Sequence, residues 1–218
     1  MNRLSAVGVL LGALVLPVLQ GCLPVLAASA ATGGAMAAVD RRSLGTQTDD
    51  ETTEWKASAR ATEQFGDRAH LNFTSYNRKV LITGEVASPE MKTEIESLVA
   101  SLPLVQGVYN EVTVGPPTSL TTRSNDAYLT TRVKARFVDS GKFNPVRVKV
   151  VTEAGVVYLL GLVTQSEADS AVQVARTTSG VVKVVTLMEI ISPAKAREFD
   201  GSAPRSDTPP AGSSLSGG

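Results

Sequence analysis

The residue types best suited to covalent or metal chemistry are scarce in this chain of 218 residues. It has one cysteine, Cys22, and one histidine, His70. A lone cysteine cannot form an internal disulfide, so Cys22 is a buried small residue, a reactive thiol or a point of attachment. Without a second His or Cys we expect no metal site, and we predict neither catalytic residues nor a cofactor apart from any attached lipid. His70 is expected to be a structural or exposed strand residue.

The segment before Cys22 decides between the possible uses of the thiol. Arg3 is the only charged residue before Asp40, and an apolar run over 4–19 follows it. A short positive end, an apolar run and small residues together are the layout of a secretory signal. The sequence Leu19-Gln20-Gly21-Cys22 resembles the bacterial lipobox, in which cleavage before the cysteine exposes it for lipid attachment.

We therefore predict a signal peptide over 1–21, with covalent diacylglycerol and N-acyl lipid on Cys22. Two acyl signals give the stable anchoring that one chain does not. An uncleaved membrane anchor is the alternative, since 4–39 is free of charge and a span needs roughly 20 apolar residues. Leu23, and no aspartate, follows the cysteine; by resemblance to lipoprotein sorting in Gram-negative bacteria, this favours the periplasm-facing outer membrane.

The region after Cys22 divides into tethers and folded parts. Residues 22–45 lack periodicity and are expected to be a flexible tether, and residues 192–218 carry Pro, Ser and Gly without an apolar stripe and are expected to be disordered. The 197 residues left after cleavage carry 20 Lys and Arg against 21 Asp and Glu, a net charge of −1. That charge gives no reason to expect a nucleic-acid partner.

An internal repeat organises the folded part. Residues 79–114 and 156–190 share matched landmarks, and the paired positions are Gly84 with Gly161, Val86 with Val163, Glu90 with Glu167, Val105 with Val181 and Val108 with Val184. Such repetition indicates a duplicated domain. We place the two copies at 46–115 and 124–191, joined by a linker over 116–123.

Each copy shows the same order of helix, strand, strand, helix and strand. In the first copy a capping box of Thr48 and Glu51 is expected to open a helix whose core stripe is Trp55, Ala59, Thr62 and Phe65. A hairpin turns at 76–79, and Ser88 caps the next helix. In the second copy the helices are expected at 124–140 and 166–178. The fold class is α+β: two tandem αββαβ units, each a three-stranded mixed sheet with two helices on one face.

The repeated motifs resemble the BON domain. The residues that carry this likeness are the strands V-x-(L/I)-x-G-x-V at 80–86 and 157–163, the Glu-bearing helix start, and the closing GV-x-x-V at 180–184. Leu104 stands where the first closing motif would have glycine. With the lipobox in front, the chain resembles dual-BON-domain outer-membrane lipoproteins of the DolP type. The resemblance implies a non-enzymatic envelope protein that preserves the membrane barrier, binds anionic phospholipid through its second domain, and in some members gathers at the division site.

Charge separates the two copies. Residues 49–67 carry six carboxylates against two cations, whereas 123–149 carry seven cations against two carboxylates. Only the second suits an anionic bilayer surface. On a helical wheel Leu129, Val133 and Phe137 form the inward stripe of the second copy's first helix. The predicted phospholipid-binding residues are Tyr128, Thr131, Arg132, Lys134, Ala135 and Arg136.

Several alternatives stay open from the sequence. In the alternative to lipid binding, the basic face is an ordinary solvated surface, and Tyr128 is half-packed on a neighbouring domain. The acidic first helix is either a partner or inter-domain surface, or compensates its own dipole. In a second functional alternative, the attached lipid is only a tether, and the two domains act as a scaffold or chaperone that recruits an envelope assembly or division factor. A lipid-modifying enzyme is the remaining class.

Overall fold

The computed structural model describes residues 40–201. The predicted signal peptide, Cys22, most of the predicted tether and residues 202–218 lie outside the described residues. None of the helices in 40–201 combines the length and hydropathy that crossing a bilayer requires.

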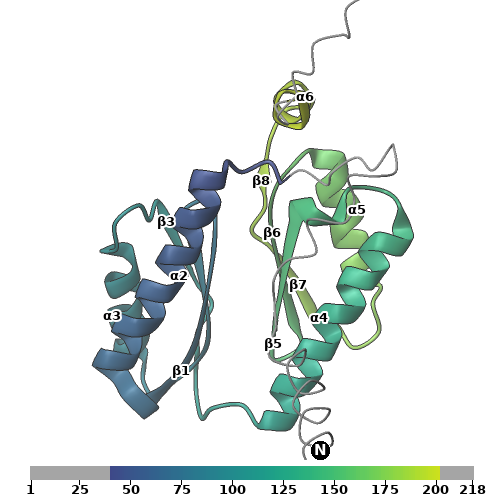
Figure 1. The fold of residues 1–218 in the computed structure, drawn as a ribbon. Helices are drawn as coiled ribbons and strands as arrows, with labels where there is room; N and C mark the ends of the chain where they lie inside the picture. The colour runs from purple at the N-terminus through teal and green to yellow at the C-terminus, as the bar shows by residue number, and fades with distance from the viewer. Residues whose placement is uncertain (1–39, 202–218) are drawn as a thin grey trace, which may run out of the picture. The chain divides into compact units, whose positions relative to one another are not determined.

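The first copy of the repeat contains two α-helices and one sheet (Figure 1). Its elements are α2 (Leu44–Phe65), the 3₁₀ turn η2 (Gly66–Arg68), β1 (Ala69–Tyr76), β2 (Lys79–Val86), α3 (Pro89–Ala100), β3 (Gly107–Asn110) and β4 (Thr113–Val114). The predicted cap of α3 is confirmed, because the Ser88 side chain accepts a hydrogen bond from the Met91 N–H and Pro89 stands in the first turn.

The second copy repeats this order. Its elements are α4 (Leu120–Ser140), η3 (Pro145–Arg147), β5 (Val148–Glu153), β6 (Val156–Val163), α5 (Gln165–Arg176), β7 (Lys183–Thr186) and β8 (Glu189–Ile190), and a further helix, α6 (Pro193–Gly201), follows. Helix α5 begins with a capping box between Thr164 and Glu167.

The strands of each copy form one mixed sheet. Strand β2 is central, antiparallel to β1 and parallel to β3 and β4, and β6 relates in the same way to β5, β7 and β8. The predicted third strand is therefore interrupted in each copy: residues 111–112 separate β3 from β4, and 187–188 separate β7 from β8. The α+β, αββαβ prediction is confirmed.

Each sheet packs one face against its own two helices (Figure 1). In the first copy Val80, Ile82 and Val86 of β2 join a core with residues of α2 and α3. In the second copy Val157, Leu159 and Val163 of β6 do the same against α4 and α5. Alternate residues of a strand point to the same face, so these positions account for only half of each central strand.

The other half of each central strand forms a third apolar cluster. It contains Leu81 and Tyr76 from the first sheet and Tyr158, Leu160 and Leu162 from the second. Burial on both faces explains why β6 reads VVYLLGLV, a continuous apolar run rather than an alternating one.

Ion pairs also join the two copies. Glu54 of α2 pairs with Lys149 of β5 at 2.8 Å, and Lys79 of β2 pairs with Glu189 of β8 at 3.1 Å. One carboxylate of the acidic first helix thus meets a cation of the second copy, which is the inter-domain use that the sequence left open.

Helix α2 differs from its prediction in both its start and its inner face. Ser43 is the N-cap and accepts a hydrogen bond from the Thr46 N–H, so the predicted Thr48 capping box is wrong, and Thr48 lies within the helix. Trp55 is 70% exposed, and Ala59 and Thr62 are exposed too, so the predicted core stripe is wrong at these three positions and correct only at Phe65. The buried residues are Asp50, Thr53, Ala57, Ala61 and Phe65. Small and polar side chains form this face, which an apolar periodicity cannot detect.

A buried aspartate explains the polar start of each inner face. Asp50 accepts hydrogen bonds from the N–H groups of Asn77 and Arg78 at 2.8 Å each, within the β1–β2 turn. Asp126 of α4 does the same for Ala154 and Gly155 at 2.9 and 2.8 Å. The four turn residues have positive φ, which is the backbone of a tight hairpin turn. Both copies therefore attach their hairpin to their first helix by one carboxylate.

Removing the Asp126 carboxylate should destabilise the second copy strongly. Asp126→Ala leaves two backbone N–H groups without their acceptor at a site where Asp126 is 4% exposed. Each lost bond to a charged acceptor contributes about 1.5–3 kcal/mol, so we expect a loss of about 3 kcal/mol in urea unfolding. Asp126→Asn keeps one acceptor oxygen and should lose less. An Ala variant as stable as the parent would contradict this role.

Both ends of the described range are fixed to the second copy by one ionic network. Arg41 is 5% exposed; its guanidinium pairs with Glu167 at 2.7 Å and Asp200 at 3.0 Å, and donates to the Leu162 carbonyl. Arg147 pairs with the same two carboxylates. The predicted tether is therefore wrong for residues 40–45, and the predicted disorder is wrong for α6, because buried charge pairs hold both segments.

This network makes stability depend on pH. Burial disfavours the Glu167 carboxylate, but hydrogen bonds from Arg41, the Thr164 N–H and Arg147 outweigh it and lower its pKa from 4.5 to about 2. Its contribution is fully present above pH 4.5 and is lost as the pH falls towards 2. Glu167→Gln should cost about 2 kcal/mol at pH 7 and flatten the decline in unfolding free energy between pH 5 and 3. An unchanged pH slope would contradict this.

The backbone restricts which residue fits at three positions, Gly84, Gly161 and Leu104. A Cβ on Gly84 would overlap the carbonyl oxygen of His70 on β1, and a Cβ on Gly161 would overlap that of Arg147, the last residue of η3 before β5. Leu104 has φ +71, whereas its counterpart Gly180 has φ +97. The leucine therefore keeps the glycine-type turn of the motif, at a cost of about 1–2 kcal/mol.

Candidate lipid-binding face

Helix α4 carries all six residues predicted to bind phospholipid. It begins after Ser119, whose side chain accepts a hydrogen bond from the Thr122 N–H at 3.1 Å. It ends at Gly141, which has φ +59 and donates its N–H to the Val138 carbonyl. The helix starts four residues before the predicted Ser124, because the Ser119 cap extends it into the predicted linker.

The inner face of α4 fixes the orientation of the helix. Leu129, Val133 and Phe137 are at most 2% exposed, which confirms the predicted inward stripe. Phe137 also contacts the ring of Phe143 edge-on, with centroids 5.0 Å apart. The face opposite this stripe must then lie towards solvent.

The outward face of α4 is aromatic and weakly apolar at its centre. Tyr128 is 61% exposed and Val138 is 65% exposed, and Thr131 and Ala135 between them are also exposed. Spacings of three and four residues place these side chains on one face of a helix. Lys134 is exposed beside this face and has no ion-pair partner among residues 40–201.

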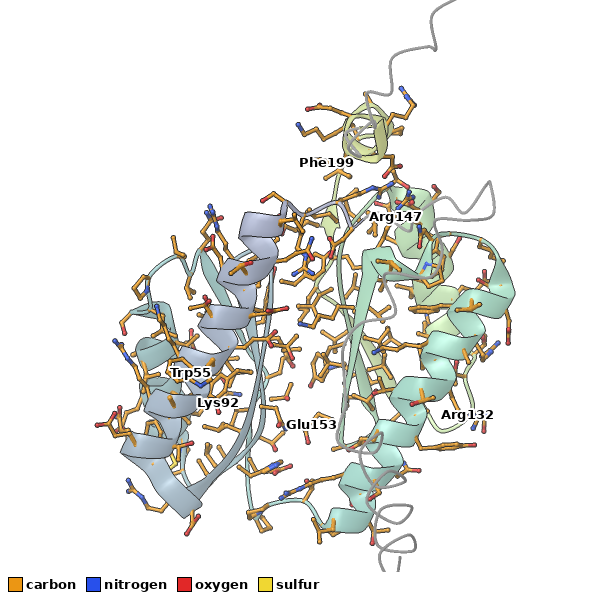
Figure 2. All side chains as sticks on the ribbon, in the orientation of Figure 1. Trp55, Lys92, Arg132, Arg147, Glu153 and Phe199 are labelled. Carbon is orange, nitrogen blue, oxygen red and sulfur yellow. The ribbon has the colours of Figure 1, made fainter. Side chains whose placement is uncertain are left out.

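Arg132 borders the same face and is half-buried (Figure 2). Its guanidinium lies 5.7 Å from the centroid of the Tyr128 ring, within the range of a cation–π contact. One of its nitrogens donates to the Ser179 carbonyl at 3.1 Å. The remaining donors of this guanidinium can therefore meet a phosphate while the side chain is held beside the tyrosine.

Arg136 has a different environment from the other predicted residues. Its guanidinium donates to the Val174 carbonyl at 3.1 Å and to the hydroxyls of Thr178 and Thr177 at 2.8 and 3.1 Å. These acceptors lie at the end of α5, where unpaired carbonyls attract cations. Arg136 thus supports the junction of α4 and α5, and adds positive charge beside the face rather than free donors.

The loop after α5 adds residues that the sequence prediction missed. Arg176, Val182 and Lys183 are exposed, and Val182 is 78% exposed. The three line a cavity of about 400 Å³. Arg132 donates a hydrogen bond to the Ser179 carbonyl, so this loop lies beside α4. The sequence signal for these exposed residues was the pair Val182 and Lys183, which interrupts the alternation of apolar and polar residues just before β7.

The cations of 123–149 fall into two groups. Arg147 and Lys149 form ion pairs with carboxylates and are neutralised. Within the described region the other five cations, Arg123, Arg132, Lys134, Arg136 and Lys142, form none. The sequence count therefore overstates the free charge of this segment, but three of these five cations, Arg132, Lys134 and Arg136, lie on and beside the outward face.

Comparison with known proteins fits this duplicated architecture. The BON domain family matches residues 52–116 and again 125–192, one match for each copy.

The chain belongs to the BON domain family.

Relatives extend this relationship along the chain. It is 38% identical over 196 residues to the outer membrane lipoprotein DolP of Haemophilus influenzae, covering 88% of this chain and 98% of that protein. It is 33% identical to the 21 kDa hemolysin of Actinobacillus pleuropneumoniae, covering 70% of this chain and 80% of that protein. These relationships support an outer-membrane lipoprotein with two BON domains as the class of this protein.

A solved structure resembles part of the chain more distantly. The C-terminal domain of CdsD, the structural protein of the type III secretion system of Chlamydia trachomatis, is 14% identical with a TM-score of 0.27. It covers 63% of this chain and 96% of that one.

Proposed function

We propose that this protein is a non-enzymatic lipoprotein of the outer membrane, anchored through acylated Cys22, that maintains envelope integrity. Its second BON domain binds anionic phospholipid with the outward face of α4. The observation that carries this proposal is an exposed tyrosine bordered by unpaired cations: Tyr128 is 61% exposed, and Arg132 and Lys134 form no ion pair within 40–201.

The composition of this face fits a headgroup surface. Tyrosine has an apolar ring and a polar hydroxyl, so it suits the boundary between acyl chains and headgroups. Arginine can donate two parallel hydrogen bonds to a phosphate. Arg132 stands beside Tyr128, so one side chain can enter the interface while the other binds a phosphate.

The strength expected of this face explains the use of an anchor. A basic residue near an anionic bilayer contributes about 1 kcal/mol, so Arg132, Lys134 and Arg136 together contribute about 3 kcal/mol. That gain corresponds to weak binding from solution, which is detectable only at high lipid concentration. A protein already tethered to the membrane needs little additional binding free energy, because tethering raises its effective concentration at the surface.

Vesicle flotation tests the proposal. Residues 23–218, which include the whole described range and lack Cys22, should float with phosphatidylglycerol vesicles at millimolar lipid and remain in solution with phosphatidylcholine vesicles at the same concentration. Binding should weaken as salt is raised, because counterions screen exposed charges.

Other flotation results would contradict lipid binding or support the scaffold. Equal flotation with both vesicle types, or none with either, would overturn the lipid-binding role. Absent vesicle binding combined with co-purification of an envelope complex would support the scaffold instead.

A further inference from the structure

A group of side chains with nitrogen and oxygen atoms that can bind a ligand lies on one face of the first copy's sheet, opposite its helices. The β1–β2 register pairs His70 with Glu85 and Asn72 with Thr83. Residues two apart on a strand share a face, so all four side chains project from the same side. Leu71 and Val86 belong to the helix-side core, which places the four on the face towards the second copy.

The second copy supplies one more carboxylate to this group. Glu153, the last residue of β5, accepts hydrogen bonds at one oxygen from the Asn72 amide at 2.9 Å and the Thr83 hydroxyl at 3.0 Å. Glu153 is labelled in Figure 2. The two donors fix this carboxylate over the first sheet, in the way that outer-shell partners orient a metal ligand.

Three potential ligands therefore converge. The His70 Nδ1 lies 3.1 Å from Glu85 Oε2. One ligand atom each from His70, Glu85 and Glu153 lies within 4.8 Å of the other two. In a tetrahedral zinc site with bonds of about 2.1 Å the ligand atoms are about 3.4 Å apart, so small side-chain rotations would complete the site.

In the described region, the only basic group that pairs with these carboxylates is the His70 imidazole. The Glu85 side chain is 5% exposed, and Glu153 is half-buried. Across residues 40–201 neither carboxylate forms an ion pair with lysine or arginine. Placing two carboxylates so close in a partly dry site is unfavourable unless a cation offsets them. With a neutral imidazole the group carries a charge of −2, which a divalent ion balances.

Solvent has a route to this site. His70 and Glu153 line a cavity of about 450 Å³, together with residues of β1, α4 and β5. This space admits a metal ion with its water. Arg123 and Asp126 also line it, but Arg123 forms no ion pair with the three ligands, and Asp126 is bound to the hairpin turn of β5 and β6.

We propose that His70, Glu85 and Glu153 bind one Zn²⁺, with water as a fourth ligand. An imidazole with two carboxylates suits zinc, whereas calcium and magnesium prefer sites made wholly of oxygen. Because Glu153 belongs to the second copy and the other ligands to the first, the bound ion links the two BON domains. The sequence did not indicate this site, since its ligands are 15 and 68 residues apart along the chain.

The single histidine provides a direct test. The mature acylated protein, residues 22–218, purified in detergent without an affinity tag, is titrated with ZnCl₂ while the imidazole signals of His70 are followed by NMR. Isothermal titration calorimetry gives the stoichiometry. We expect one Zn²⁺ per chain, a saturable shift of the His70 signals, and a higher thermal unfolding midpoint with zinc than with MgCl₂ or CaCl₂.

Variants locate the ion. His70→Gln and Glu153→Gln should each weaken zinc binding at least 10-fold, whereas Glu63→Gln, an exposed carboxylate on α2, should not. Circular dichroism of the zinc-free variants checks their fold, and Glu153→Gln retains an oxygen for Asn72 and Thr83. Imidazole signals unmoved by excess zinc, or equal binding by all variants, would overturn the proposal.

Discussion

Replacing Tyr128 by Ala together with Arg132 by Glu is expected to weaken binding of the 23–218 protein to phosphatidylglycerol vesicles by at least about 30-fold. The arginine change removes one cation and adds one anion at the surface, a difference of about 2 kcal/mol. Each 1.4 kcal/mol is a factor of ten in affinity, and loss of the exposed ring adds to the effect. Flotation at several lipid concentrations measures it.

The first copy offers a matched control. Trp55 and Arg60 are an exposed aromatic residue and an exposed arginine on α2. Trp55→Ala with Arg60→Glu makes the same kind of change in a copy whose first helix is acidic, and should leave vesicle binding unchanged. Equal losses from both double variants would show that overall charge, rather than the α4 face, governs binding.

Cys22→Ser is expected to abolish lipid attachment completely. A serine hydroxyl does not replace the thiol that receives the diacylglyceryl group, so the precursor should keep its signal peptide and disappear from the outer-membrane fraction. Globomycin, which blocks lipoprotein signal cleavage, should cause the parent precursor to accumulate. Mass spectrometry and membrane fractionation measure both effects.

The uncleaved anchor makes a different prediction. A chain held by residues 4–39 as a span would keep the same electrophoretic mobility and membrane fraction after Cys22→Ser. Masses that differ only by the exchange of sulfur for oxygen, without acyl groups on the parent, would contradict the lipoprotein account.

Local sequence patterns predicted the fold where the inward residues are apolar. The repeat gave the order of elements, and the spacing of Leu129, Val133 and Phe137 gave the inner face of α4. The same method failed on α2, whose inner face contains Asp50 and Thr53. The burial of Asp50 is explained by the two turn N–H groups that donate hydrogen bonds to it. These groups belong to residues 27 and 28 positions later in the chain, so no local pattern reveals them.

The two ends of the described range, 40–201, show the same limit. Composition correctly described 192–218 as polar and rich in small residues, yet Asp200 of α6 binds Arg41 across 159 residues. Neither residue stands in a recognisable local pattern. Long-range ion pairing fixed these segments, and no periodicity records it.

The candidate site was predictable in its orientation but not in its detailed charge. An outward Tyr128 follows from the helical wheel. The ion pairs of Arg147 and Lys149 and the bonds from Arg136 to α5 depend on how the elements meet. For the same reason Val182 and Lys183 were missed, since the fold places their loop beside α4.

The most direct test of the central claim asks which surface meets the bilayer. A Tyr128→Trp variant in a Trp55→Phe background carries its single tryptophan on α4, whereas the parent carries its own on α2. With brominated phosphatidylglycerol vesicles, the fluorescence of the variant should be quenched and blue-shifted, while that of the parent should change little. Quenching of Trp55 in the parent, with the residue at position 128 unaffected, would contradict the account.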